Sequence, residues 1–420
     1  MAELKKLNVL MVGTGEYTTG FVHDKASTSD KKVGVVALTM FDLRRRGKVG
    51  EISMVGTNGS KMPRIREHLD NNIGKVYHMD TSLATFPKDG ERDPESYKAA
   101  IDQLSPGDAI TVFTPDPTHY DIALYAIRRQ IHVLLTKPAV KSIEHHNHLV
   151  SEAKKHNVLV MVEHHKRFDP AYSDAKGRSE NLGEFGFFSS YMSQPKKQLD
   201  TFRSWAGKES DISYYLNSHH IDMHCWMVSD TSVPYKVTAS AATGVASSEP
   251  FNLVAGTEDT ITLLTNWHSM KHGNTHQGTA VYTASWTAPS ASEVHSQQHF
   301  HYLAEKGEIR VDQAHRGYSV TTDEVAYANL NPFYMKYTPD EDGHFDGQRG
   351  YGYISLEKFV DLARKVNQNT ITLDEIDQRG LPTIRNTAIT TAILEAGRRS
   401  LDEKRSVGLE KHADGSWAIV

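Results

Sequence analysis

The stretch from Ala109 to Pro138 constrains the fold more than any other part of this chain. Ala109–Phe113 and Ile131–Leu135 are short apolar runs rich in β-branched residues, as expected of buried parallel strands. Between them, Asp116-Pro117 supplies a helix N-cap and a proline at the first helical position. A strand, a helix and a second parallel strand form a β-α-β unit, which predicts an open α/β sheet.

Polar side chains follow both predicted strands. In an open α/β sheet, ligands bind outside the carboxyl ends of the strands, so these residues should share one rim. Lys137 is held there by the proline that follows it, and is a candidate catalytic group. The rim residues are Thr114, Pro115, His119 and Lys137.

The first predicted strand, Leu7–Val12, leads to the same rim and into the run GTGEYTTG. Two glycines one residue apart allow a tight turn and close approach of the backbone to a pyrophosphate. Thr18 stands where the fingerprint has its third glycine, so a plain strand-turn is the alternative for this run alone. Together with the other strand ends, it predicts a dinucleotide site that includes Gly13, Thr14, Gly15, Tyr17 and Thr18.

Composition narrows the class of protein. A chain of 420 residues with 38% hydrophobic and 24% charged residues is expected to form two packed domains. A net charge of -5 argues against nucleic acid or an anionic membrane as a partner. Cys225 is the only cysteine, and no apolar run reaches the ~20 residues of a membrane span. We therefore expect a cytoplasmic protein without a disulfide.

The order of predicted elements changes along the chain. Residues 1–160 alternate strands and helices, which predicts a doubly wound parallel sheet of Rossmann type, with one of its strands at Val76–His78. The polar segment 16–32 is expected to be an inserted loop. Residues 161–420 show strand alternation with few helices, which predicts an α+β domain with a large, open, mainly antiparallel sheet, and C-terminal helices that can pack back on the first domain. The predicted strands of this second part are Phe185–Tyr191, Lys236–Val245, Thr260–Trp267, Thr279–Ala288 and Gly307–Asp312.

An ordered set of motifs resembles the Gfo/Idh/MocA oxidoreductase family. The set comprises Gly13-x-Gly15, Thr114-Pro115 with His119, Lys137-Pro138, Arg167-Phe168-x-Pro170 and His219-x-x-Asp222. The resemblance implies a dinucleotide-binding domain, a second domain whose open sheet forms homodimers, and hydride exchange between a nicotinamide and a sugar carbon. Within the family, the runs GTGEYTTGFV, EHHKRFDPAYSDAKGR and DISYYLNSHHID resemble D-galacturonate reductases.

The same resemblance assigns catalytic roles. The family's catalytic lysine corresponds to Lys137, although its usual Glu-Lys-Pro is Thr-Lys-Pro here. The family's active-site histidine corresponds to His219, and Tyr215 stands where many members have an aspartate. An alkoxide formed by hydride transfer needs a proton or a nearby positive charge. We expect His219 or Tyr215 to donate the proton, with Lys137 as the electrostatic partner.

A uronate carboxylate needs cationic or amide ligands. Candidate substrate residues are Lys166, Arg167, Arg203, Trp205, Asn217, His219 and His220. A structural salt bridge is the alternative role for the cations, and a core position the alternative for Trp205. The cluster of His219, His220, Asp222 and His224 has metal-ligand side chains. Because the dinucleotide motifs account for the rim, we expect no metal.

The end of the second strand bears on the cofactor. It reads Val55-Gly56-Thr57-Asn58-Gly59-Ser60-Lys61, without the acidic residue that would repel a 2′-phosphate. Thr57, Asn58 and Ser60 can donate hydrogen bonds, and Lys61 adds a positive charge. The sequence favours NADPH, while NADH use stays open because Asn58 can also hold a free 2′-hydroxyl.

The prediction from sequence is an NADPH-dependent reductase of a hexuronate aldehyde, D-galacturonate to L-galactonate. Three alternatives stay open: a D-glucuronate reductase, an oxidoreductase of neutral sugars, and a catalytically silent dinucleotide-binding regulator. The presence of both Lys137 and His219 argues against the regulator.

Overall fold

The computed structural model describes residues 4–22, 25–27, 31, 33–323, 327–345 and 350–420. The chain divides into two compact units, each assembled from three segments. Unit 1 consists of Met1–Ala139, His148–Phe168 and Pro332–Asn386, and unit 2 of Val140–Asn147, Asp169–Asn331 and Thr387–Val420. A compact unit need not be a functional domain, so the division into residues 1–160 and 161–420 stays a prediction.

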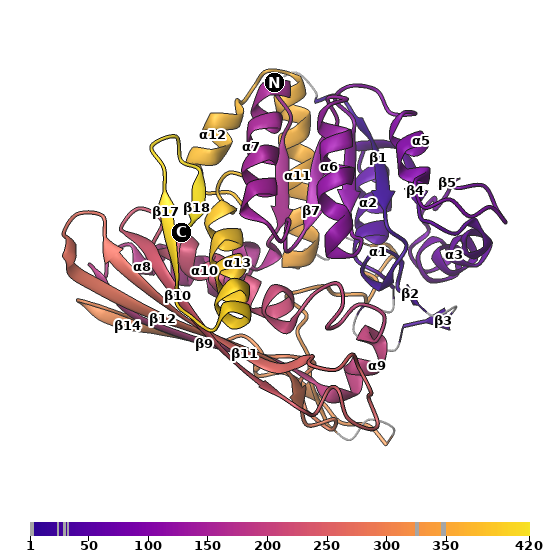
Figure 1. Cartoon of the computed structure of the whole chain (residues 1–420). Coiled ribbons are helices and arrows are strands. Elements are labelled where there is room, and N and C mark those ends of the chain that lie inside the picture. Colours follow the sequence, from indigo (N-terminus) through magenta and orange to yellow (C-terminus); the bar gives the residue numbers. More distant parts are fainter. Residues whose placement is uncertain (1–3, 23–24, 28–30, 32, 324–326, 346–349) are drawn as a thin grey trace. The chain divides into compact units, whose positions relative to one another are not determined.

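Unit 1 is built on a six-stranded parallel sheet (Figure 1). Its strand order, β5-β4-β1-β6-β7-β8, is that of the dinucleotide-binding doubly wound fold. The order reverses between β1 and β6, so a crevice is expected at the carboxyl ends of these two strands. The strands are β1 (Leu7–Val12), β4 (Val49–Val55), β5 (Ala84–Phe86), β6 (Ala109–Val112), β7 (His132–Thr136) and β8 (Val160–Glu163).

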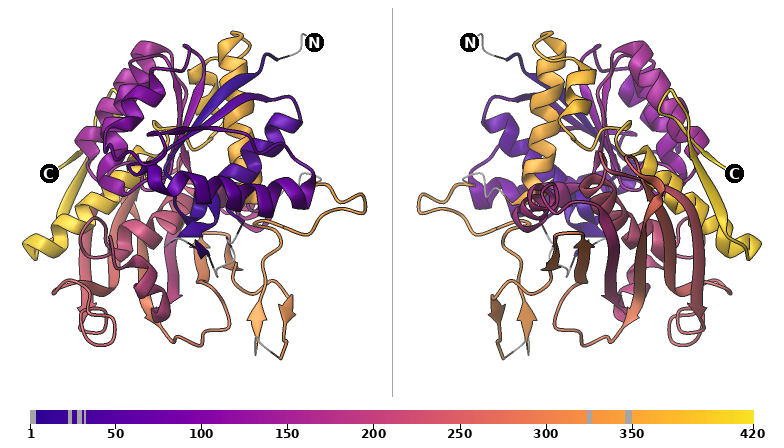
Figure 2. Two further views of the ribbon diagram at one scale, coloured as in Figure 1. Left: turned by 90° about the vertical axis from the view of Figure 1, so that its right-hand side faces the viewer. Right: turned by 90° about the vertical axis from the view of Figure 1, so that its left-hand side faces the viewer.

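Helices cover both faces of this sheet (Figure 2). One of them comes from the far end of the sequence: α11 packs against α2, β8 and the short helix η4. The helices of unit 1 are α1 (Glu16–Thr19), α2 (Val36–Arg45), α3 (Met62–Leu69), α4 (Lys75–Tyr77), α5 (Ser96–Ile101), α6 (His119–Ile127), α11 (Tyr351–Asn367), α12 (Leu373–Gln378) and the short turns η1 (Gly59–Lys61), η2 (Asp70–Gly74), η3 (Asp116–Thr118) and η4 (His165–Phe168). Helix α7 (Ile143–His156) contributes residues to both units.

Two local predictions for unit 1 are wrong. Val76–His78 was expected as a strand, but Lys75–Tyr77 continues the helical path of α3 and η2. Tyr77 is buried there and donates a hydrogen bond to the Tyr337 carbonyl at 2.6 Å, so tertiary packing outweighs its β propensity. Asp116 was expected as an N-cap, but neither η3 nor α6 has a side-chain cap.

The segment expected as an inserted loop starts with ordered structure. After α1, the short strands β2 (Phe21–Val22) and β3 (Lys25–Ala26) pair as a hairpin. The backbone amide of Ser27 then donates a hydrogen bond to the Gly20 carbonyl at 2.8 Å. Residues 23–24, 28–30 and 32 lie outside the described residues.

Unit 2 is built on an eight-stranded mixed sheet of order β14-β13-β9-β12-β11-β10-β17-β18, in which only the β9–β12 pair is parallel. Alternation places Phe188, Tyr282 and Trp267 in the core on one face. The other face carries Thr262 and Thr283, whose hydroxyls are 3.0 Å apart. The strands are β9 (Phe185–Pro195), β10 (Ser232–Thr243), β11 (Glu258–Ser269), β12 (Gly273–Ala288), β13 (Gln297–Ala304), β14 (Gly307–Asp312), β17 (Val407–Lys411) and β18 (Trp417–Ile419), with a separate pair β15 (Ser319–Val320) and β16 (Ala328–Asn329).

Helices pack on the core face of that sheet, with α13 against β10 and α10 against α13. The predicted fold class, a Rossmann domain with a parallel sheet followed by an α+β domain with a large and mainly antiparallel sheet, is confirmed. The helices of unit 2 are α8 (Pro170–Ser179), α9 (Leu199–Phe202), α10 (Ser218–Met227), α13 (Ala388–Glu403) and the turns η5 (Lys196–Gln198) and η6 (Ser213–Asn217).

Candidate active site

The turn after β1 has the geometry that a pyrophosphate needs. Gly13 adopts φ +109°, and a Cβ on it would lie 2.1 Å from the Phe113 carbonyl oxygen, so only glycine fits. Gly15 opens α1, and a Cβ on it would meet nothing within 4 Å. The turn thus packs tightly against the protein at Gly13 and leaves free space beside Gly15. These residues fit a dinucleotide bound against the carboxyl end of β1.

Lys137 follows the last residue of β7, between the ends of β6 and β8. Burial lowers the pKa of Lys137 to about 8, opposed by the negative charges of Asp116 and Glu163 and assisted by the positive charge of Lys31. A lysine with such a pKa is a mixture of ammonium and amine near neutral pH. It can therefore either stabilise an anion or exchange a proton.

His119 joins two of the strand ends. Its Nε2 lies 2.9 Å from the Thr114 carbonyl oxygen, and its Nδ1 lies 3.0 Å from that of Pro138. The ring is fully buried. The structure therefore places His119 between the turns that carry Thr114 and Lys137, with both ring nitrogens facing backbone carbonyls.

Sequence reasoning missed Glu163, the last residue of β8. Its carboxylate accepts hydrogen bonds from Ser355 Oγ at 2.7 Å, from His165 Nδ1 at 2.7 Å and from Tyr17 at 3.4 Å. Burial and the charge of Glu163 raise the pKa of the Tyr17 phenol well above its usual range. Tyr17, predicted to contact cofactor, thus directs its hydroxyl to a carboxylate and stacks its ring on Phe113 with centroids 5.0 Å apart. The sequence signal for this residue was a glutamate at the end of an otherwise apolar strand.

The loop after β4 holds the predicted cofactor residues. Asn58 Oδ1 accepts a hydrogen bond from Ser60 N at 3.1 Å and so caps η1, while Thr57, Ser60 and Lys61 are exposed. This loop pairs with residues 91–93: the Gly59 amide donates to the Glu91 carbonyl at 2.8 Å, and Asn58 and Arg92 form an isolated bridge. Arg92 is a second cation beside this loop that the sequence analysis did not include.

Most of the other predicted residues belong to unit 2. Tyr215 and Asn217 lie in η6, a π-helical turn of a kind frequent at functional sites, and His219 and His220 open α10. The Asn217 amide donates to Ser213 Oγ at 3.1 Å and to the Ile261 carbonyl at 3.3 Å. His220 Nε2 lies 2.7 Å from the Tyr172 hydroxyl. Asn217 and His220 therefore support the helix start, while Tyr215 is only partly buried.

An aromatic cluster surrounds Tyr215. The ring of Trp205 lies 5.1 Å from that of Tyr215, 4.9 Å from that of Phe202 and 6.1 Å from that of Trp286. The Tyr215 hydroxyl accepts a hydrogen bond from Gln194 Nε2 at 3.4 Å. Trp205 thus packs on the core of unit 2 with part of its surface exposed.

The histidines next to His219 point to separate partners. His224 is buried, its Nδ1 lies 2.6 Å from the Tyr282 hydroxyl, and burial lowers its pKa to about 3. Asp222 accepts a hydrogen bond from Thr390 at 3.4 Å. Across the described part of the chain, no group of three or more His, Cys, Asp or Glu side chains is placed to hold a metal ion.

The predicted substrate cations differ in exposure. Lys166 and Arg167 lie in η4 and are buried, and Arg167 Nη1 donates to the Gly380 carbonyl at 2.9 Å. Arg203 follows α9, is exposed, and pairs with Asp200 at 2.9 Å. Arg167 thus makes a structural contact within unit 1, and Arg203 is the cation of the three that solvent reaches most easily.

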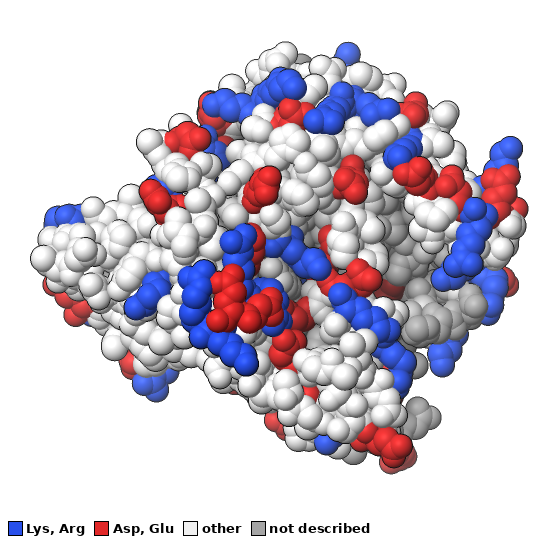
Figure 3. Space-filling model, in the orientation of Figure 1, with Lys and Arg blue, Asp and Glu red and all other residues white. Residues whose placement is uncertain are grey.

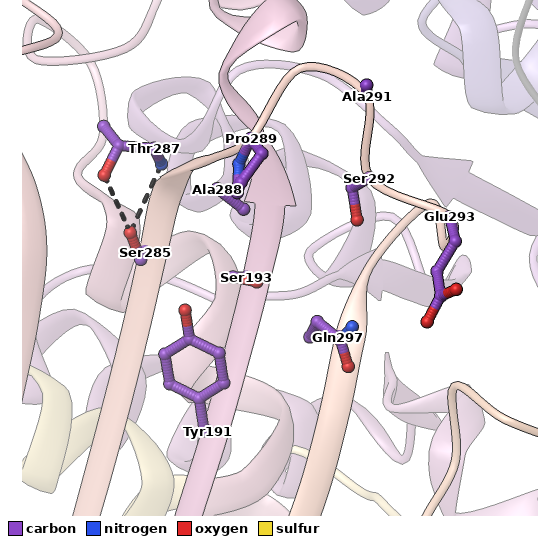
Figure 4. A pocket seen from close by; sticks show the side chains of 10 residues that line it. All are labelled: Tyr191, Ser193, Ser285, Thr287, Ala288, Pro289, Ala291, Ser292, Glu293 and Gln297. Carbon is purple, nitrogen blue, oxygen red and sulfur yellow. Dashed lines mark hydrogen bonds between the residues drawn. The ribbon is translucent and has the colours of Figure 1, made fainter.

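Figure 4 shows a cavity of about 600 Å³ at one end of the large sheet in unit 2. Five of its ten lining residues carry a hydroxyl group, and the Ser285 hydroxyl already donates to the Asp259 carbonyl at 3.2 Å. None of the predicted site residues lines it. On the face drawn in Figure 3, basic and acidic side chains are interspersed and form no single basic field among the described residues. The lining residues are Tyr191, Ser193, Ser285, Thr287, Ala288, Pro289, Ala291, Ser292, Glu293 and Gln297.

The strand order of unit 1 and the turn after β1 are those of the dinucleotide-binding doubly wound class, and one segment of the chain matches a family model. Residues 7–164 match the model of the Gfo/Idh/MocA oxidoreductase family, described as having an NAD-binding Rossmann fold. This segment, which holds Gly13, Gly15 and Lys137, is similar to the Gfo/Idh/MocA family, and over residues 7–164 the resemblance predicted from the motifs is confirmed.

Individual relatives match only part of their length. The chain is 30% identical over 118 residues to the uncharacterized oxidoreductase YdgJ of Escherichia coli, covering 27% of this chain and 34% of that protein. It is 37% identical over 79 residues to scyllo-inositol 2-dehydrogenase (NAD(+)) of Bacillus subtilis, covering 19% of this chain and 23% of that protein. The chain thus spans about a third or less of these relatives' length.

Solved structures share the fold over the whole chain. The crystal structure of GenD2 from gentamicin A biosynthesis in complex with NAD superposes with a TM-score of 0.67 at 17% sequence identity, covering 97% of both chains. At this identity the likeness concerns the fold alone. In the part of the chain that the structure describes, no helix is long and apolar enough to cross a membrane.

Proposed function

We propose that this protein reduces the aldehyde of a hexuronate, D-galacturonate to L-galactonate, with NADPH. The observation that carries the proposal is Lys137: it lies at the carboxyl end of β7, and burial lowers its pKa to about 8. The glycine turn after β1 ends at the same edge of the same sheet. A reactive lysine beside a dinucleotide turn suits hydride chemistry at a carbonyl carbon.

The chemistry of the proposed reaction is a two-electron reduction. A nicotinamide held at this edge of the sheet would supply the hydride for the aldehyde carbon, and the carbonyl oxygen would take a proton. Lys137, as the ammonium, stabilises the negative charge that develops on this oxygen, and charge stabilisation in a dry site lowers the barrier by several kcal/mol. His219 or Tyr215 donates the proton. Gly13 and Gly15 fix the pyrophosphate end of the dinucleotide.

The cofactor preference rests on the loop after β4. It carries no acidic side chain from Thr57 to Lys61, and Lys61 is exposed. A 2′-phosphate therefore meets hydroxyl, amide and ammonium groups. NADH stays the alternative cofactor, because the family model that matches the chain is described as NAD-binding.

A neutral polyol is the second candidate substrate class. It is favoured by the B. subtilis relative, which is a scyllo-inositol 2-dehydrogenase and shares 37% identity over 79 residues. D-Glucuronate differs from D-galacturonate in one hydroxyl configuration and stays a third choice. A catalytically silent regulator is disfavoured, because Lys137 and His219 are both present.

The proposal extends to location and assembly. We place the protein in the cytoplasm, on the ground of its single cysteine and net charge of -5. We also propose a homodimer formed through the polar face of the large sheet in unit 2, where long strands offer a regular surface of Thr, Ser and His side chains.

A substrate panel tests the function directly. The purified protein is mixed with NADPH or NADH and with D-galacturonate, D-glucuronate, D-galactose or scyllo-inositol, and the absorbance of the reduced nicotinamide is followed; for the polyol, NADP⁺ or NAD⁺ is used and its reduction is followed. Oxidation of NADPH with D-galacturonate at the highest kcat/KM supports the proposal. A higher kcat/KM with scyllo-inositol contradicts it in favour of the polyol, and no turnover with any pair favours the regulator.

A further inference from the structure

Glu163 is a buried carboxylate that the proposed mechanism does not use. It ends β8, is 2% exposed, and is the register partner of Thr136, the residue before Lys137. Neighbouring strands lie about 4.8 Å apart, and parallel strands end at the same edge. Glu163 and Lys137 therefore leave adjacent strands at the same edge of the sheet, one residue apart in level.

The carboxylate is fixed from three elements of unit 1. Ser355 on α11 and His165 on η4 each donate a hydrogen bond of 2.7 Å, and Tyr17 on α1 donates one of 3.4 Å. The His165 ring stacks on that of Tyr351 at 5.5 Å and lies 5.5 Å from that of Tyr334. These donors hold the carboxylate in one orientation.

Three charged groups act on Lys137. Asp116, on the turn after β6, and Glu163 both favour the ammonium, whereas Lys31 disfavours it. His119 lies on the carbonyl of the next residue, Pro138, at 3.0 Å. The chain neighbours of Lys137, Thr136 and Pro138, carry no charge. A carboxylate that acts on Lys137 must therefore come from another part of the sheet. Of the two candidates, Asp116 and Glu163, Glu163 is the more buried.

We propose that Glu163 is the positioning residue of Lys137, a carboxylate supplied across the β7–β8 register that holds the lysine at the rim as an ammonium. The role of that ammonium in hydride transfer rests on the proposed function. The electrostatic link between the two side chains does not, because it exists in the ligand-free protein.

The test measures the titration of Lys137 without any substrate. The full chain is trace-labelled with acetic anhydride over a pH series, and acetylation of Lys137 is quantified by peptide mass spectrometry. In Glu163→Gln the pKa of Lys137 should fall by roughly one pH unit, as expected on losing a nearby opposite charge. Glu67→Gln removes an equal charge from the exposed face of α3 and should leave it unchanged. An unchanged pKa in folded Glu163→Gln overturns the inference.

A relocated charge gives the complementary test. Adding Thr136→Glu to Glu163→Gln returns a carboxylate at the paired position on β7, next to Lys137. This carboxylate should restore the pKa of Lys137. A pKa that stays low in the double variant contradicts a role for charge at this position. If Glu163→Gln does not fold, Glu163→Ala, which leaves no buried amide, is used in the same measurement. The pKa of Lys137 is measured without substrate, so it does not depend on the outcome of the substrate panel. The proposed function and the proposed role of Glu163 can therefore fail independently.

Discussion

At the scale of single residues, Lys137 is the side chain on which the proposed chemistry depends most. Replacing it with methionine keeps much of its length and removes its charge. Turnover in Lys137→Met should fall at least ~100-fold, the lower range for lost acid-base or electrostatic help. Dinucleotide binding, measured by fluorescence titration, should survive. Near-normal turnover would remove Lys137 from the mechanism.

The proton donor is resolved by a pair of variants in unit 2. His219→Ala should lower turnover by a factor similar to that of Lys137→Met, because the product oxygen then lacks its proton. Tyr215→Phe keeps the ring packed against Trp205 and removes only the hydroxyl. A larger loss in Tyr215→Phe than in His219→Ala would reverse the assignment.

The pKa of Lys137 predicts the pH dependence of the reaction. The ammonium form is the active one, and it is lost as the pH rises through about 8. Above that pH, kcat/KM should decline about tenfold per pH unit, as for one essential proton. Lys137→Arg keeps its charge at high pH, so any activity it retains should show no such decline. A flat profile in the unmodified protein would contradict an essential ammonium.

Lys61 provides a prediction on cofactor choice. Only NADPH carries a 2′-phosphate, so Lys61→Ala should raise the KM for NADPH more than that for NADH, by roughly tenfold if one charge-assisted hydrogen bond of about 1.5 kcal/mol is lost. Lys75→Ala, an exposed lysine in α4, is the matched control. Equal effects on both cofactors would mean that Lys61 serves structure alone.

At the scale of elements, the two glycines after β1 have separable roles. Gly13→Ala places a side chain at φ +109° and 2.1 Å from the Phe113 carbonyl oxygen, so the free energy of unfolding should fall by at least roughly 2 kcal/mol. Gly15→Ala meets nothing within 4 Å in the protein and should fold normally, but should weaken dinucleotide binding. Thermal unfolding and cofactor titration compare the two. Equal stability of both variants would contradict the steric argument.

Elements with a simple apolar pattern were the ones that the sequence predicted well. Leu7–Val12 is predicted residue for residue, because buried parallel strands are continuous apolar runs. Strand β13, Gln297–Ala304, was missed although its alternation is regular: the buried Phe300 and Tyr302 alternate with two histidines, His299 and His301. They lie on the outer face, where His299 stacks on Tyr191. Polar residues on an outer face weaken the signal of a strand without weakening the strand.

The candidate site was predictable where one motif carried it. Lys137 and the glycine turn are each carried by a short run of sequence, and they lie at the carboxyl ends of β7 and β1, which flank β6 in the same sheet. Glu163 was missed because its proximity to Lys137 arises from strand order and register, which one sequence does not specify. The network that fixes it also includes Ser355, nearly 200 residues away along the chain. Contacts between residues so far apart in sequence become visible only in the three-dimensional structure.

At the scale of the whole molecule, the segment Pro332–Asn386 shows why chain order and spatial order differ. It follows most of unit 2 in sequence, yet it belongs to unit 1, where α11 packs against α2 and β8. Lys48 on this side of the sheet pairs with Glu357 at 2.6 Å and Asp361 at 2.7 Å. The segment Pro332–Asn386 therefore completes unit 1 and supplies a hydrogen-bond donor, Ser355, to Glu163.

The substrate class is a property of the complete protein, and we expect the substrate to be an anion. If two of Lys166, Arg167 and Arg203 contact its carboxylate, each charge-assisted bond contributes roughly 1.5–3 kcal/mol. Losing both costs about 3–6 kcal/mol, or roughly two to four orders of magnitude in kcat/KM. D-Galactose, which has a hydroxymethyl group in place of the carboxylate, should therefore be a very poor substrate.

Arg203 is the cation through which this expectation can be tested, because it is exposed and pairs with Asp200 on the neighbouring helix α9. Arg203→Ala should lower kcat/KM for D-galacturonate and leave the residual activity on D-galactose little changed. Arg178→Ala, which removes a similar exposed pair with Asp174 on α8, should affect neither sugar. Comparable kcat/KM values for the acid and the neutral sugar in the unmodified protein would exclude the uronate and favour an oxidoreductase of neutral sugars, because a site without a carboxylate ligand gains nothing from the charge.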